Sequence, residues 1–64
     1  MYEAVYETFE VKVNNLEEYA FNHNYIVVRL VNGEFWFYGA YDTEERANEV
    51  AIEIGNGGVF RNAR

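Results

Sequence analysis

The chain contains no cysteine, no proline and no serine, and His23 is its single histidine. Without cysteine there can be no disulfide and no thiolate metal site, and one histidine cannot build a zinc site. A hydrolase needs a nucleophile beside an oriented base, and the aliphatic hydroxyls are limited to Thr8 and Thr43. No glycine motif precedes a helix, where it would cradle a phosphate. We therefore expect a protein that is not an enzyme and holds no cofactor or metal.

Basic residues are also scarce, because five Lys and Arg stand against eleven Asp and Glu, for a net charge of −6. Nucleic acids and anionic membranes are bound by neutralising phosphates with Lys and Arg, so we expect neither as a direct partner. No apolar run approaches the roughly 20 residues of a membrane span. Residues 1–7 carry acids where a secretory signal carries base. These features predict a cytoplasmic protein.

Aromatic residues, by contrast, are abundant: six Tyr, five Phe and one Trp in 64 residues. A chain of this length is a single domain, residues 1–64, and buries only about 60% of the surface that it exposes when unfolded. Each buried aromatic side chain contributes about 150–250 Å², so a compact core can still form. Self-association is a further source of stability.

Hydrophobic periodicity in the first part of the chain predicts a strand and a short helix. Residues 2–13 alternate as a half-buried strand, with a bulge or break expected near Glu7, an acid on the apolar side. Asn15 and Glu18 have the spacing of a capping box and predict a helix of about two turns that ends at residues 22–24.

The clearest local signal is a hairpin. Residues 25–31 and 34–41 are rich in β-branched and aromatic residues, and Asn32-Gly33 between them favours a type I′ turn. That turn sets Arg29 opposite Trp36 and Val27 opposite Tyr38. The face predicted to cover the core consists of Ile26, Val28, Leu30, Phe35 and Phe37. The opposite face is expected to carry Tyr25, Val27, Arg29, Trp36 and Tyr38, joined by Tyr6 and Thr8.

A second helix is predicted over residues 43–54, with Asp42 as its N-cap and acids in its first turn. Its apolar stripe consists of Ala47, Val50, Ala51 and Ile54. The glycines of residues 55–58 end it, and residues 59–61 form a last strand before a frayed tail. The order βαββαβ predicts an α+β fold of the ferredoxin-like kind, a four-stranded antiparallel sheet with two helices on one face.

The segment FYGAYDTEERA, residues 37–47, resembles the signature of SPOR domains, in which a strand ends in Gly-x-aromatic before an acidic helix start. The similarity extends over residues 37–60, and the first half lacks the matching Gly-x-aromatic-Ser pattern. SPOR domains fold as βαββαβ and bind septal peptidoglycan through the sheet. The resemblance therefore implies a carbohydrate-binding alternative, with Trp36, Tyr38 and Tyr25 stacked on sugar rings.

Two surfaces are candidates for partner binding. The first is the aromatic sheet face, with Tyr6, Tyr25, Arg29, Trp36 and Tyr38. Tyr, Trp and Arg are enriched in binding hot spots, although cross-strand pairs of this kind also serve only to stabilise a sheet. Stacking of single-stranded nucleic acid on this face lacks the basic surround that it needs.

The second candidate surface is the outer side of the helix over residues 43–54. Glu45, Glu49 and Glu53 form an acidic row, and Ile52 is an apolar residue in the same sector. One interpretation is a solvated face, and the other is an acidic helix presented to a basic groove.

These features favour a small acidic protein-binding module. Its profile matches inhibitors from bacteriophages or mobile elements that block a nucleic-acid-binding protein of the bacterial host, such as a polymerase, a nuclease or a CRISPR effector. The acids would then stand in for phosphates on a basic surface. The alternatives are the SPOR-like glycan-binding domain and a structural homodimer whose sheet faces pack together.

Overall fold

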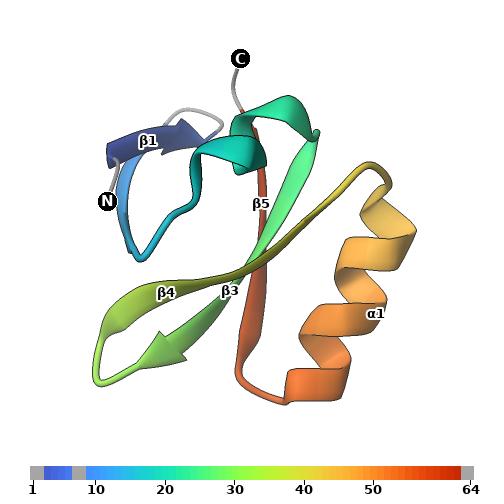
Figure 1. Ribbon diagram of the computed structural model, residues 1–64. Helices are drawn as coiled ribbons and strands as arrows, with labels where there is room; N and C mark the ends of the chain where they lie inside the picture. The colour runs from blue at the N-terminus through green and yellow to red at the C-terminus, as the bar shows by residue number, and fades with distance from the viewer. Residues whose placement is uncertain (1–2, 7–8, 63–64) are drawn as a thin grey trace.

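The computed structural model describes the backbone of residues 3–6 and 9–62 and the side chains of residues 11–62. Figure 1 shows strands crossing at the centre of the molecule, with one α-helix to the side. The elements in chain order are β1 (Glu3–Tyr6), β2 (Phe9–Asn14), the 3-10 helix η1 (Glu18–Asn22), β3 (Tyr25–Val31), β4 (Glu34–Tyr41), α1 (Glu44–Ile54) and β5 (Gly57–Arg61). The predicted α+β class is confirmed.

The sheet has the strand order β1-β2-β4-β3-β5 and is mixed, because β2 pairs with β4 in parallel through Val13 and Phe35. The prediction of a purely antiparallel sheet was wrong. The strand expected over residues 2–13 is instead two strands, and β1 pairs antiparallel with β2 from Tyr6 opposite Phe9. The chain therefore reverses direction before it reaches β4. Glu7, where a break was expected, lies outside the described residues.

The hairpin has the predicted bounds, and both turn residues have positive φ, 51° at Asn32 and 78° at Gly33. Arg29 lies opposite Trp36, as predicted, but the register shifts between Val27 and Val28. Val27 therefore faces Gly39 and not Tyr38, which was the predicted partner. An extra residue on β4 produces this bulge, and Tyr38 is that residue.

Both faces of the sheet are covered. On one face Ile26 and Val28 pack with Leu16 and Ala20 from the segment around η1, and on the other Val27 packs with Ala47 and Val50. Successive strand residues point to opposite faces, so η1 and α1 lie on opposite sides of β3. The prediction of two helices on one face was wrong in this respect.

The first predicted helix is only the short 3-10 segment η1. Asn15 has a φ of 62°, which is outside the helical range, and the residue that precedes η1, Glu17, makes no side-chain capping bond. The capping box predicted from Asn15 and Glu18 does not form. Leu16 and Ala20 are nevertheless buried, so their apolar contacts hold this segment on the sheet without a regular α-helix.

Helix α1 begins one residue later than predicted. Thr43 is the N-cap, and its hydroxyl oxygen accepts a hydrogen bond from the Arg46 backbone N–H at 3.2 Å, whereas Asp42 was the predicted cap. The predicted apolar stripe is confirmed, because Ala47 and Val50 are buried against the sheet. The helix ends at Gly55, with a φ of 80°.

No helix within residues 3–6 and 9–62 is long and apolar enough to cross a membrane.

The close contact between α1 and β5 provides a test of the packing. A Cβ atom on Gly57 would lie 2.7 Å from the Cα of Ala51 and 2.8 Å from its carbonyl oxygen. Because backbone atoms cannot move aside cheaply, we expect Gly57→Ala to lower the free energy of unfolding by about 1–3 kcal/mol. Urea denaturation followed by circular dichroism measures this change.

The matched control is Gly58→Ala, whose Cβ would have the Val28 Cγ2 atom as its nearest neighbour at 3.6 Å, an ordinary contact. We expect its stability to be unchanged or raised by about 0.5 kcal/mol, since glycine is costly within a strand. Equal destabilisation by both variants would contradict the close packing of α1 on β5.

Candidate functional site

The predicted aromatic sheet face is divided in two by α1. Val27 is fully buried and Tyr25 half-buried, both beneath the helix, whereas Trp36 and Tyr38 are 36% and 48% exposed. Arg29 is exposed opposite Trp36. The structure thus keeps Arg29, Trp36 and Tyr38 on the surface and buries Val27. Tyr25 is separated from them and lines a hollow with Asn48 and Val59.

Tyr6 does not join this surface through its strand. It lies in β1, and β2 stands between β1 and β4 in the sheet. Its side chain is outside the described part of the chain. The sequence alternation placed Tyr6 in a single long strand, and the reversal into two strands moves it to the far edge.

Tyr41, at the end of β4, is a residue that the sequence analysis did not single out. Its ring lies over Gly39, because a Cβ atom placed on Gly39 would be 2.6 Å from the Tyr41 hydroxyl oxygen. Glycine two residues before an aromatic was visible in the sequence as Gly-x-aromatic. Its physical meaning is that the missing side chain leaves room for the phenol.

The surroundings of this phenol show where the sheet and α1 adjoin. Burial is the main cause that raises the pKa of Tyr41 above its ordinary value of 10.0, followed by the charge effect of Tyr38. Arg46 opposes the shift, whereas Tyr19 of η1 and then Glu53 raise this pKa further. Arg46 and Glu53 on α1 are therefore near enough to the end of β4 for their charges to act on the Tyr41 phenol.

The predicted acidic row is exposed, with Glu45, Glu49 and Glu53 all on the surface of α1. Arg46 Nη1 donates to Glu49 Oε1 at 3.4 Å, a surface pair that stabilises a helix by only a few tenths of a kcal/mol. Ile52 is 79% exposed, but it lies towards β5, where it lines a hollow with Asn48 and Ala51. Ile52 and the Glu53 flank thus point to different sides of α1.

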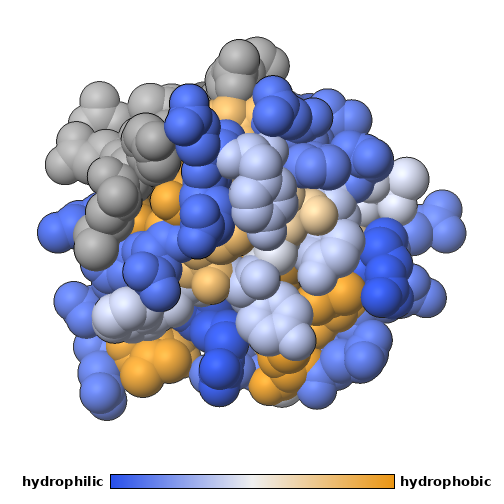
Figure 2. Space-filling view, viewed as in Figure 1, coloured by the Kyte–Doolittle hydropathy of each residue, from blue (hydrophilic) through white to orange (hydrophobic). Residues whose placement is uncertain are grey.

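We call the combined surface the aromatic–acidic face, and it consists of Arg29, Trp36, Tyr38, Tyr41, Glu49 and Glu53. Figure 2 shows pale, weakly polar residues over the middle of the molecule, where β4 crosses in Figure 1, and both hydrophobic and strongly polar residues beside them over α1. The two surfaces that the sequence suggested separately meet here at Tyr41.

The end of the hairpin carries further apolar exposure. Leu30 is 50% exposed, although it was predicted to lie in the core. The hairpin extends beyond the layers that cover the rest of the sheet (Figure 1), so the alternation continues after the core has ended. Asn56 holds this part of β3 in place, donating from its side chain to the Leu30 carbonyl at 3.1 Å and accepting the Leu30 N–H at 3.0 Å.

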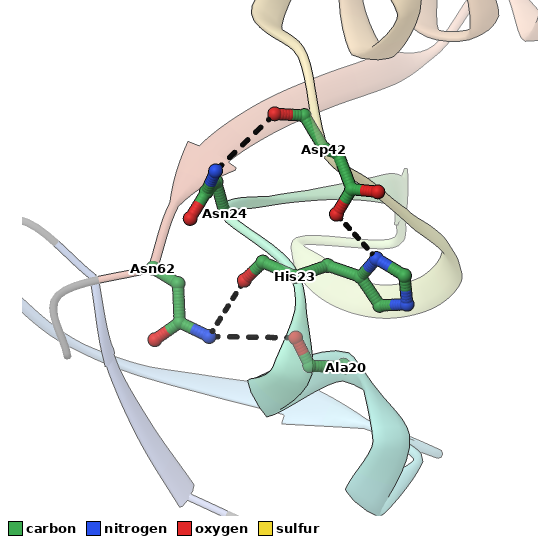
Figure 3. Close-up of polar contacts among 5 residues, drawn as sticks. All are labelled: Ala20, His23, Asn24, Asp42 and Asn62. Carbon is green, nitrogen blue, oxygen red and sulfur yellow. Dashed lines mark hydrogen bonds and ion pairs between the residues drawn. The ribbon is translucent and has the colours of Figure 1, made fainter.

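A polar cluster joins the ends of four elements (Figure 3). His23 Nδ1 lies 2.7 Å from Asp42 Oδ1, and the Asn24 side chain donates to the Asp42 carbonyl at 3.3 Å. The Asn62 amide donates to the carbonyls of Ala20 and His23, each at 3.4 Å. Asn62 was predicted to lie in a frayed tail and is instead tied to η1 and β3.

The His23–Asp42 pair has the geometry of a base and its orienting carboxylate, but it lacks a nucleophile. The chain has no serine or cysteine, and the oxygen of the nearby Thr43 hydroxyl caps α1. Within the described residues, no three His, Asp or Glu side chains are placed to hold a metal ion. The bonds of the cluster link η1 to the ends of β3, β4 and β5, and the pairing of Asp42 with His23 explains why Asp42 is not the helix cap.

No protein-family model, curated protein or solved structure matches the chain. The resemblance to SPOR domains therefore depends on residues 37–60 alone, and the observed fold lacks the two helices on one face that this resemblance implied.

The environment of Tyr41 predicts how stability changes in alkali. Below its ordinary pKa of 10.0, Tyr41 is protonated in both the folded and the unfolded chain. As the pH rises from there towards the higher folded-state pKa, only the unfolded chain loses the proton, so the free energy of unfolding falls. We expect Tyr41→Phe to remove this part of the alkaline loss, measured by urea denaturation across that pH range.

Tyr25→Phe is the matched control, since Tyr25 is a half-buried phenol that packs against α1 and is not among the causes of the Tyr41 shift. It should retain the alkaline loss of stability that Tyr41 causes. If the two variants respond to alkali in the same way, the hydroxyl of Tyr41 is not in the desolvated position described above.

Proposed function

We propose that the chain is a non-enzymatic protein-binding module that contacts its partner through the aromatic–acidic face. The observation that carries this proposal is the exposure of Trp36 and Tyr38 on a half of the sheet that α1 leaves uncovered. Trp, Tyr and Arg are the residue types that most often dominate binding energy. A group of exposed aromatics on a small domain usually marks an interaction site.

The charge of the chain favours a partner with a basic surface. The net charge is −6, and Glu49 and Glu53 are exposed on α1, with Glu53 near enough to Tyr41 for its charge to act on the phenol. Complementary charge speeds encounter and disfavours acidic competitors. The aromatics would supply the buried centre of the contact and the carboxylates its rim.

The basic partner that best fits this charge is a nucleic-acid-binding protein. Such proteins present Lys and Arg where phosphates bind, and carboxylates of the aromatic–acidic face would occupy those positions. In this form of the proposal the chain is an inhibitor from a bacteriophage or mobile element that acts in the bacterial cytoplasm. Its targets would be a host polymerase, nuclease or CRISPR effector.

The two alternative functions, carbohydrate binding and homodimer formation, would use the same exposed aromatic residues in other ways. Carbohydrate binding by stacking needs Trp36, Tyr38 and Tyr25 on one open surface, but Tyr25 packs beneath α1. A homodimer that joins two aromatic–acidic faces would bring like charges together, which weakens association. Sedimentation of the chain alone over a range of concentrations detects such a dimer directly.

A photo-crosslinking experiment can identify the partner. We would replace Trp36 with a photoreactive phenylalanine analogue and irradiate the chain in an extract of the organism that encodes it. The control carries the same analogue at Lys12, an exposed position on β2. A basic protein crosslinked from position 36 and not from position 12 is the expected result.

Binding to the identified partner should depend on Trp36. We expect Trp36→Ala to weaken binding by at least about 30-fold, the effect of losing a hot-spot residue worth about 2 kcal/mol. Leu30→Ala should leave the affinity unchanged, because Leu30 is a large exposed apolar residue outside the aromatic–acidic face. Titration calorimetry provides both values, and circular dichroism checks the fold.

A second pair of variants tests whether binding depends on the acidic residues of the aromatic–acidic face. Glu53→Gln should weaken binding and reduce its salt dependence, whereas Glu17→Gln removes an exposed acid outside the face and should have little effect. Equal affinities for the native chain and Trp36→Ala, or a crosslink to an acidic protein, would refute the proposal.

A further inference from the structure

The second feature of interest is the outer edge of β5. This strand lies at one end of the strand order and pairs with β3 on its inner side. No other strand within residues 3–6 and 9–62 pairs with it. An edge strand presents a row of backbone donors and acceptors that another extended chain can join.

The register shows which backbone groups face outward. The Asn62 N–H donates to the Asn24 carbonyl at 2.8 Å, and the Leu30 N–H donates to the Asn56 carbonyl at 3.0 Å. In an antiparallel pair, alternate residues bond to the partner strand, so the even-numbered residues of β5 bond to β3. The N–H and C=O groups of Gly57, Val59 and Arg61 therefore point away from the sheet.

A groove runs beside this edge, between β5 and α1. It consists of two hollows of about 320 and 750 Å³ that share Asn48 and Val59 in their walls. Glu44 and Arg61 border one hollow, and Ile52 borders the other. Figure 1 shows α1 and β5 side by side, joined by a tight turn. A strand added to β5 would place alternate side chains in this groove.

The edge has few of the features that usually prevent pairing. Natural edge strands are often blocked by proline, lysine or a bulge. The chain has no proline, β5 reads Gly-Gly-Val-Phe-Arg, and its pairing with β3 is continuous from Gly57 to Arg61. Arg61, at the last position, is the strand's single charged side chain.

We propose that the outer edge of β5 binds an extended basic peptide segment of a partner protein, which adds to the sheet as a further strand. Its apolar side chains would enter the groove over Val59 and Ile52, and its Lys or Arg residues would lie near Glu44. The net charge of −6 attracts a basic segment and opposes a second copy of the chain, and within the groove Glu44 attracts the basic residues while Arg61 opposes them. The site is separate from the aromatic–acidic face and does not depend on it.

The test uses the full chain labelled with ¹⁵N and a capped peptide of alternating lysine and valine, about seven residues long. On titration we expect the amides of Gly57, Val59 and Arg61 to shift and to become protected from hydrogen exchange. The inward amides of Gly58 and Phe60 should change much less. A peptide with glutamate in place of lysine should bind at least about tenfold more weakly, as should the lysine peptide with proline in place of its central valine.

Two variants at one position separate the backbone from the side chain. Arg61→Pro removes an outward N–H without removing a bond to β3, and we expect it to weaken peptide binding by about tenfold or more. Arg61→Ala removes the charge and keeps the N–H, and it should bind at least as well as the native chain. Trp36→Ala should also retain peptide binding, so the proposal for the β5 edge and the proposal for the aromatic–acidic face are tested independently.

Several results would overturn the proposal. These are equal binding of the lysine and glutamate peptides, equal loss of affinity in Arg61→Pro and Arg61→Ala, and shifts centred on Glu49 and Glu53 and not on β5. Protection of the outward amides that grows with protein concentration, without peptide, would assign the edge to a second copy of the chain instead.

Discussion

Burial of β3 on both faces is the constraint on which the structure depends. Ile26, Val27 and Val28 have no exposed surface, and because they are consecutive they point to opposite sides of the sheet. In this chain one strand, β3, contributes to the apolar layers on both faces of the sheet. The segment around η1 covers one side with Leu16 and Ala20, and α1 covers the other with Ala47 and Val50. The aromatic–acidic face and the outer edge of β5 are the parts of the sheet that these two segments leave uncovered.

Local chemistry in the sequence was enough to predict the hairpin and the apolar stripe of α1. Asn32-Gly33 specifies its turn through backbone conformation alone, and the stripe follows from helical period. That β3 is covered on both faces was harder to predict. Residues 25–31 were interpreted as alternating between a buried and an exposed face, although Ile26 to Val28 form a continuous apolar run. Such a run is typical of a strand buried on both sides, and it was the signal that the two helices lie on opposite faces.

The remaining differences come from contacts between residues far apart in the chain. The parallel pairing of β2 with β4 joins Val13 to Phe35, which no periodicity records. Asp42 and Thr43 are both good helix caps, and the choice between them depends on His23, which binds Asp42. The bulge that separates Val27 from Tyr38 likewise requires knowledge of Gly39 and of the Tyr41 phenol above it. The exposed aromatic residues were therefore predicted individually, while their relation to α1 was not.

Small residues on the side of α1 that packs on the sheet explain why parts of the sheet stay uncovered on both flanks of this helix. Ala47 is buried, and the absent side chain of Gly57 allows the backbone at Ala51 to approach the start of β5 closely. A helix of 11 residues is about 16 Å long, and with such short contact residues it covers only a narrow strip of the sheet. On one flank this leaves Trp36 and Tyr38 exposed. On the other flank, the outward-facing backbone N–H and C=O groups of Val59 lie beside the groove that Asn48 also lines. The close packing of one helix thus leaves two separate surfaces with different chemistry.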